Sequence, residues 1–250
     1  MKTTGNTLFI PGATSGIGLG LALRFQALGN TVIIGGRRTE LLERLVAEHP
    51  GLDAVEIDTS DAASIARAFD TVTSRHPDLN VLIAMAGIMQ PEDLHDPGFL
   101  ATAERTITTN LLGPLRLLAA FIPFLSRAKD PVVMTVSSGL AFVPLPSTPS
   151  YNATKAAIHS FTESLRVQLA DTPIQVLELV PPAVRTDLMP GQAESPHAVP
   201  LEDFLDEVMS IIETQPDADE ILVKAVGFLR FAEANGSYPQ VLANLSGRAL

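Results

Sequence analysis

The feature that most limits the fold of this chain is a glycine-rich turn near its start. A short apolar run at residues 8–10 leads into Gly12, Gly16 and Gly18, and apolar residues at helical spacing follow over residues 19–25. A strand, a glycine-rich turn and a helix in this order begin a dinucleotide-binding unit, because glycines let the backbone approach a pyrophosphate at the positive end of the helix. The spacing is GxxxGxG, and an ordinary glycine-rich strand-to-helix loop is the alternative.

The end of the second predicted strand indicates which dinucleotide would bind. The run at residues 31–36 is followed by Arg37 and Arg38, and residues 29–39 contain no acid. An acid here would bind the 2′-hydroxyl of NAD, whereas arginine accommodates the 2′-phosphate of NADP. We therefore expect NADP(H). The alternative is that one arginine merely starts the helix predicted over residues 39–48 and points into water.

Asp58 follows the third predicted strand and has two interpretations. Its position after residues 54–57 would let the carboxylate reach the edge of an adenine ring. It could equally be an N-terminal cap of the helix predicted over residues 61–75. The sequence favours neither.

A tyrosine and a lysine four residues apart indicate proton transfer. Tyr151 and Lys155 would project from one face of a helix, and Ser138 lies 13 residues before the tyrosine. Free tyrosine has a pKa of about 10, and a nearby cation would lower that pKa toward the operating range. Ser138 could hold a carbonyl oxygen beside the phenol. Because no side chain supplies hydride, this interpretation requires a cofactor.

Six motifs together resemble the short-chain dehydrogenase/reductase family, over Gly12 to about Thr186. More narrowly, the chain looks like the DltE-like branch of that family. The motifs, in chain order, are Gly12-x-x-x-Gly16-x-Gly18, Ala84-Met85-Ala86-Gly87, Asn110-Leu111-Leu112-Gly113, Val136-Ser137-Ser138-Gly139, Tyr151 to Lys155, and Pro181-Pro182-Ala183-Val184-Arg185-Thr186.

The resemblance implies a role for each matching residue. Tyr151 would exchange a proton with the substrate oxygen, Lys155 would lower the pKa of the tyrosine and bind the nicotinamide ribose, and Ser138 would orient the carbonyl. Asn110 would hold a water that returns the proton through Lys155. The cofactor-binding residues are then expected to be Gly12, Thr14, Ser15, Gly16, Ile17, Gly18, Arg37, Arg38, Asp58, Ala86, Gly87, Tyr151, Lys155, Pro181, Val184 and Thr186.

Three departures from the family pattern concern cofactor affinity. Pro11 replaces a threonine, and since proline cannot continue a central ladder we expect the first strand to end at Ile10. Met85 lies where the family has a polar residue. Pro182 replaces a glycine and stiffens the loop over the nicotinamide. None of these changes touches the predicted proton-transfer residues.

Alternation of strands and helices predicts a single α/β domain over residues 1–250, a doubly wound Rossmann sheet flanked by helices. We expect six parallel strands, a long helix near 99–126 and another near 150–170. The sequence from Ser237 to Leu245 predicts a short capped helix in place of a seventh strand. The family commonly builds tetramers on that strand, so we expect a homodimer. The strands are predicted near 7–10, 31–35, 53–57, 80–84, 131–136 and 174–179.

Composition narrows the partners and the compartment. The net charge of −11 argues against nucleic acid. Cysteine is absent, which is compatible with a reducing compartment. No secretory pattern opens the sequence and the longest apolar run, Leu117 to Leu125, is too short to span a bilayer, so we expect a cytoplasmic protein without a membrane partner.

The histidines show no ligand spacing, and no metal site is assigned. His159, one turn past Lys155, is expected at the surface or in an interface.

The identity of the substrate is the property that the sequence determines least. Apolar residues near the expected pocket would either line it or belong to the core; they are residues 140–145, Met89, Leu188 and Met189. Only Arg185 could bind a carboxylate of the substrate. We expect a small, uncharged, partly apolar carbonyl compound or secondary alcohol. The acidic segment 187–215 is either a solvated helix face or a substrate lid. A nucleotide-binding regulator or scaffold with a degraded cofactor site is the alternative to the oxidoreductase.

Overall fold

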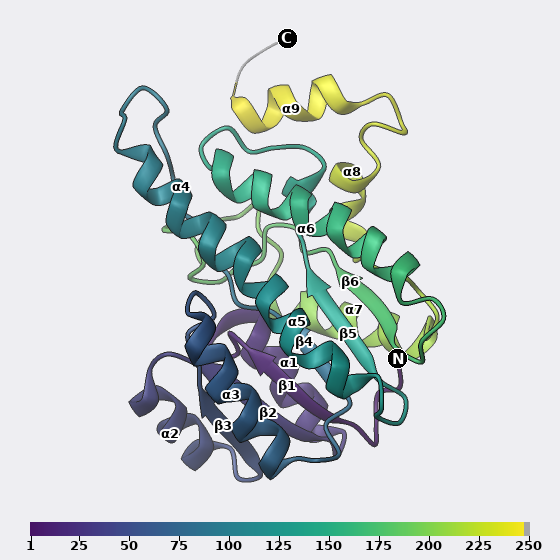
Figure 1. The fold of residues 1–250 in the computed structure, drawn as a ribbon. Helices are drawn as coiled ribbons and strands as arrows, with labels where there is room; N and C mark the ends of the chain where they lie inside the picture. The colour runs from purple at the N-terminus through teal and green to yellow at the C-terminus, as the bar shows by residue number, and fades with distance from the viewer. Residues whose placement is uncertain (248–250) are drawn as a thin grey trace.

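The strands of the protein form one parallel sheet in the computed structural model, which describes residues 1–247 (Figure 1). Within these residues the strand order is β3-β2-β1-β4-β5-β6-β7. The order reverses between β1 and β4, which makes a switch point where ligands bind in such sheets. The strands are β1 (Thr7–Pro11), β2 (Thr31–Gly36), β3 (Leu52–Glu56), β4 (Val81–Ala84), β5 (Val132–Val136), β6 (Gln175–Leu179) and β7 (Glu220–Ile221).

Helices cover both faces of this sheet. Leu8 and Ile10 of β1 pack with α1, α2 and α7, whereas Phe9 points to the other face and packs with α3, α5 and α6. Continuous apolar strands of this kind are typical of a sheet buried on both sides. The helices are α1 (Gly16–Ala27), α2 (Thr39–Glu48), α3 (Ala62–Arg75), α4 (Phe99–Ile107), α5 (Gly113–Leu125), α6 (Pro149–Gln168), α7 (Leu201–Thr214), α8 (Gly227–Arg230) and α9 (Tyr238–Ser246).

The doubly wound parallel sheet and its six predicted strands are confirmed, but the expected absence of a seventh strand is wrong. β7 pairs with β6, with Glu178 opposite Glu220 and Leu179 opposite Ile221. This strand has two residues, so its sequence carries no alternation, and only its position beside β6 defines it. The predicted terminal helix is present as α9, in addition to the strand. Its Ser237 makes no capping bond, and residues 248–250 of the predicted domain lie outside the described residues.

The predicted end of the first strand also needs correction. Pro11 is the last residue of β1, one residue past the predicted end, and the N–H of Gly12 continues the ladder to the Gly35 carbonyl at 2.8 Å. Proline is tolerated there because the next N–H makes the bond. The long helix predicted near 99–126 is confirmed as the helical stretch Phe99–Leu125, which contains a π-helical turn, Thr108–Leu112, between α4 and α5.

The stretch Phe99–Leu125 is long and apolar enough to cross a membrane by length and composition alone. Its second half, α5, buries Leu117, Leu118 and Phe121 against the sheet. A core helix of a globular domain meets the same criterion, so the stretch is weak support for a membrane span.

Candidate active site

A cleft of about 510 Å³ opens at the switch point of the sheet. Every residue predicted to bind the cofactor lines it, from the glycine turn at one end to Val184 and Thr186 at the other. Ser138, Tyr151 and Lys155 line the same cleft. Other polar residues line the cleft as well. Ser137 lies in the predicted serine motif, and Asp187 and Gln192 lie in segment 187–215, whereas no sequence pattern singled out Thr59, Gln90 and Thr109.

The glycine turn gives the cleft a wall made of backbone. Gly12 and Gly16 have φ angles of +90° and +54°, which residues with side chains rarely adopt. A Cβ atom on Gly12 would lie 2.6 Å from Cα of Ala86. α1 then starts at Gly16, so its N-terminal N–H groups and the positive end of its dipole lie at the cleft.

Two exposed arginines follow β2, at the end of the cleft that lies away from the tyrosine. The Arg38 guanidinium lies 3.5 Å from the Thr14 hydroxyl. Asp58 accepts bonds from the Ser60 backbone and hydroxyl, at 2.9 and 2.7 Å. Burial alone would raise the pKa of Asp58, but these bonds and the charge of Arg37 together hold that pKa below its usual value.

Asp58 lines the cleft and does not cap α3. The capping residue is Asp61, whose carboxylate accepts from the N–H groups of Ala63 and Ser64 at 3.0 and 3.2 Å. The interpretation of Asp58 as the cap is therefore wrong, and its contact with an adenine ring stays a prediction.

The residues predicted to transfer a proton come from the segment after β5 and from α6. Ser138 follows the end of β5, and its hydroxyl oxygen accepts from the N–H of Leu140 at 3.1 Å. Tyr151 and Lys155 lie one turn apart on α6, and each side chain is buried, with 6% of the residue exposed. The Lys155 ammonium donates to the Val136 carbonyl at 2.8 Å and lies 5.5 Å from the centre of the Tyr151 ring.

Burial reverses the expected shift of the tyrosine. It raises the pKa of Tyr151 to about 12, although a hydrogen bond with Ser138 opposes the rise. Burial also lowers the pKa of Lys155 to about 8, opposed by the charge of Glu178. The expectation that Lys155 would bring the tyrosine pKa below 10 is therefore wrong for this structure, because desolvation is the largest influence on that pKa.

Asn110 lies next to the cleft without lining it. It belongs to the π-helical turn and is 1% exposed. Its amide binds both backbone groups of Ile88, accepting from the N–H at 2.8 Å and donating to the carbonyl at 2.7 Å. Since Ile88 is a cleft residue that follows β4, Asn110 fixes the wall from behind.

His159 is not the surface residue that its place in the sequence suggested. Its ring is largely buried and binds the carboxylate of Glu178, which no motif had singled out. Together with Glu220 these two residues form a group whose nitrogen and oxygen atoms lie within 4.8 Å of one another. Sequence spacing could not show it, because the three residues come from α6, β6 and β7.

A parallel sheet whose glycine-rich turn lies at the switch point defines the class of dinucleotide-binding α/β proteins. A family model described as short chain dehydrogenase matches residues 6–196. The chain belongs to the short-chain dehydrogenase family, and within it resembles DltE, an uncharacterised oxidoreductase of Bacillus subtilis. The two are 40% identical over 191 residues, which is 75% of each chain.

Two solved structures show the same fold. A short chain dehydrogenase from Burkholderia cenocepacia, in complex with NADP, is 30% identical over 98% of both chains, with a TM-score of 0.80. A 3-ketoacyl-(acyl-carrier-protein) reductase from Brucella melitensis, complexed with NADH, is 26% identical over 90% of this chain and 96% of its own, with a TM-score of 0.76.

Proposed function

We propose that the protein transfers a hydride between NADP(H) and a carbonyl or secondary alcohol of a small, uncharged, partly apolar substrate, with Tyr151 as general acid and base. One observation carries this proposal: the glycine turn and Arg37 lie in the same cleft as Ser138, Tyr151 and Lys155. A dinucleotide on the glycine turn would therefore have its far end beside the tyrosine. A regulator with a degraded site has no comparable support, since Pro11 keeps the ladder and the turn intact.

The residues of the cleft fit a dinucleotide. A Cβ on Gly18 would lie 2.7 Å from the Gly12 carbonyl oxygen, so the turn packs closely only with glycine there. Backbone N–H groups at the start of α1 can then bind a pyrophosphate. Lys155 would bind the nicotinamide ribose, and Val184 and Thr186 the carboxamide.

The preference for NADP rests on charge. Arg37 and Arg38 are both exposed on the cleft wall, and two guanidinium groups suit a 2′-phosphate. The NADP bound to the Burkholderia protein supports this preference, whereas the NADH of the Brucella protein shows that the fold alone does not decide it.

When bound, the nicotinamide ring supplies or accepts the hydride. Tyr151 is protonated at neutral pH because the pKa of its phenol lies well above 7, so it can act as the acid of carbonyl reduction. The Ser138 hydroxyl, fixed by Leu140, orients the substrate oxygen. The Lys155 charge offsets the phenolate as it forms, and Asn110 holds the neighbouring wall in place. For alcohol oxidation the phenolate form of the same tyrosine, which has first lost its own proton, would accept the proton of the alcohol.

An uncharged substrate is favoured by the substrate end of the cleft, where Met89 and Leu188 contribute apolar surface. Arg185 donates instead to the Ser195 carbonyl at 3.3 Å and is not a lining residue. Of the segment 140–145, Val143 is buried in a separate small cluster with Leu229, and no residue of the segment lines the cleft.

We propose segment 187–215 as the substrate lid. Asp187, Leu188 and Gln192 line the cleft, while the α7 part packs on the sheet through Phe204 and Leu205. The residues before α7 would therefore be the part that covers the substrate. We further propose a cytoplasmic homodimer, on the cysteine-free sequence and the exposed apolar residues of α4.

The test is cofactor titration followed by turnover. Fluorescence titration should show tighter binding of NADPH than of NADH, and a panel of ketones and aldehydes should reveal reduction. Tyr151→Phe should bind NADPH as the wild type does but lose about 100- to 10,000-fold in turnover, the range for general acid–base catalysis.

The chain has one other tyrosine, and Tyr238→Phe on α9 is the matched control with unchanged turnover. Failure to bind NADPH would exclude the enzyme. Full turnover by Tyr151→Phe would remove that residue from its role, and tighter NADH binding would refute the role of Arg37 and Arg38.

A further inference from the structure

Glu178 is a fully buried carboxylate that the mechanism above does not use. It lies on β6 with none of its surface exposed. One oxygen accepts from the Ser137 hydroxyl, and the two oxygens lie 3.0 and 2.9 Å from Nδ1 of His159. Ser137 is itself a cleft residue, so the buried carboxylate lies directly behind the wall of the active site. A buried charge is retained at a cost, and it needs compensating partners.

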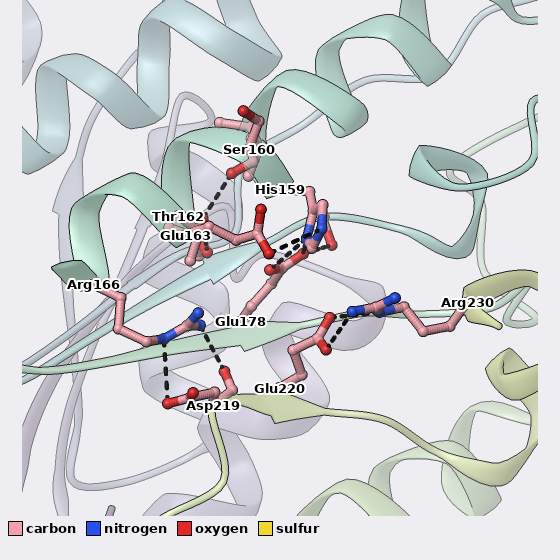
Figure 2. Close-up of polar contacts among 12 residues, drawn as sticks. His159, Ser160, Thr162, Glu163, Arg166, Glu178, Asp219, Glu220 and Arg230 are labelled. Carbon is pink, nitrogen blue, oxygen red and sulfur yellow. Dashed lines mark hydrogen bonds and ion pairs between the residues drawn. The ribbon is translucent and has the colours of Figure 1, made fainter. Parts of the chain in front are cut away.

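His159, which binds Glu178, belongs to a row of residues along α6. Tyr151, Lys155, His159 and Glu163 follow at intervals of four, so they share one face of the helix. The first two lie in the cleft, the His159 side chain is 18% exposed, and that of Glu163 is 60% exposed. Figure 2 shows the imidazole of His159 between the carboxylates of Glu163 and Glu178. The row leads from the candidate active site to solvent.

The balance of charges assigns Glu178 to Lys155. On the other side of the cluster, Glu220 of β7 makes a two-pronged ion pair with Arg230 of α8, at 2.8 and 2.9 Å (Figure 2). That pair is locally neutral. Burial lowers the pKa of Lys155, and the charge of Glu178 is what opposes this lowering. The charge of Glu178 also contributes to the raised pKa of Arg230, but there the hydrogen bond with Glu220 is the largest cause. Lys155 is therefore the fully buried cation for which Glu178 is the stabilising charge.

A metal ion is the alternative occupant of this cluster, since His159, Glu178 and Glu220 present ligand atoms close together. Each of these side chains is already bound by protein groups, and a cation would have to displace Arg230 from Glu220. The network as it stands is satisfied without an ion.

We propose that Glu178 is a positioning residue of the active site: clamped by Ser137 and His159, its carboxylate is the counter-ion that keeps Lys155 charged and in place beside Tyr151. His159 would shield Glu178 and Lys155 from solvent. Its ring packs edge-on against that of Phe142, with the ring centres 4.6 Å apart. This inference deepens the proposed function and rests on it for its importance to catalysis, but the charge coupling itself can be measured without substrate or cofactor.

The direct test is the titration of Lys155 by NMR, with isotope-labelled lysine ε-carbons. The chain has four lysines, Lys2, Lys129, Lys155 and Lys224, and the signal of Lys155 is the one lost in Lys155→Arg. We expect a wild-type midpoint near pH 8. Glu178→Gln should lower that midpoint by about one pH unit, because the favourable negative charge is gone.

Two variants separate charge from structure. Glu163→Gln also replaces a glutamate by a glutamine, but in an exposed side chain on the face of α6 that carries Lys155. It should leave the Lys155 midpoint unchanged. Glu178→Asp keeps the charge and should keep the midpoint closer to that of the wild type than Glu178→Gln does, even where thermal stability falls. If Glu178→Gln does not fold, Glu178→Met removes the charge without burying an unpaired amide.

An unchanged midpoint in the charge-removing variant would overturn the proposal and leave Glu178 as a packing residue. Turnover assays decide the function separately. A shifted midpoint in a protein that turns over no carbonyl compound would refute the proposed function but support the counter-ion. Turnover with an unshifted midpoint would refute the counter-ion alone.

Discussion

A methyl group at Gly18 would lie 2.7 Å from the Gly12 carbonyl oxygen and 2.9 Å from Cα of Ala13. Both neighbours are backbone atoms of the turn, so neither can rotate away. Gly227, at the start of α8, differs because its added Cβ would meet nothing closer than a ring carbon of Phe231 at 3.9 Å. Substitutions at the two glycines therefore distinguish the steric clash at Gly18 from the general effect of replacing a glycine in a helix.

Gly18→Ala should lower the free energy of unfolding by about 1–3 kcal/mol, the cost of overpacking a tight site. It should also weaken NADPH binding by more than about tenfold, equivalent to about 1.4 kcal/mol, because the turn must shift. Urea unfolding and fluorescence titration measure the two effects. Gly227→Ala should match the wild type in both, and equal behaviour of the two variants would contradict the steric explanation.

At the scale of elements, the π-helical turn between α4 and α5 places Asn110. A π-turn widens a helix by one residue, and such turns are frequent at functional sites. Here it brings the Asn110 amide to the backbone of Ile88, in the loop after β4, where it makes two hydrogen bonds. The interruption of the helix thus ties the helical layer to the loop that walls the cleft.

Asn110→Ala should lower the free energy of unfolding by about 2 kcal/mol, because two backbone groups of Ile88 lose their partner. Denaturant unfolding measures this loss. Asn244→Ala, an exposed asparagine of α9, is the control and should change stability little. A loss no larger than that of the control would show that water replaces the amide at Ile88.

At the scale of the molecule, apolar side chains remain exposed along α4 and the π-helical turn. Leu100, Ile107 and Leu112 are 56%, 42% and 38% exposed. Leu100 and Ile107 are seven residues apart, two helical turns, and so lie on one side of α4. A continuous exposed apolar surface is a mark of an interaction site, and the homodimer proposed above would cover it.

Ile107→Lys should convert the proposed dimer to a monomer, because a charge would be buried at the centre of the contact. Sedimentation velocity at several concentrations measures the change. Leu28→Lys, at the end of α1 and 45% exposed, introduces the same charge elsewhere and should leave the dimer intact. A wild-type monomer at all concentrations would refute the homodimer, and a dimer retained by Ile107→Lys would place its contact elsewhere.

The sequence by itself determined the parallel sheet, the glycine turn, the two arginines after β2 and the tyrosine–lysine spacing on α6. Each of these depends on residues close together in the chain, so periodicity and spacing carry the information. The order of the motifs then placed them at one end of the sheet, since the carboxyl ends of parallel strands meet there.

Only the tertiary structure decided what depends on residues far apart. β7 exists because residues 220–221 lie beside β6, and Glu178 gains its partners from the segment after β5 and from α6. The pKa of Tyr151 rises because the folded chain excludes water from the phenol, an effect that a four-residue spacing cannot express. Burial, and the pairing of groups across elements, are properties of the assembled fold.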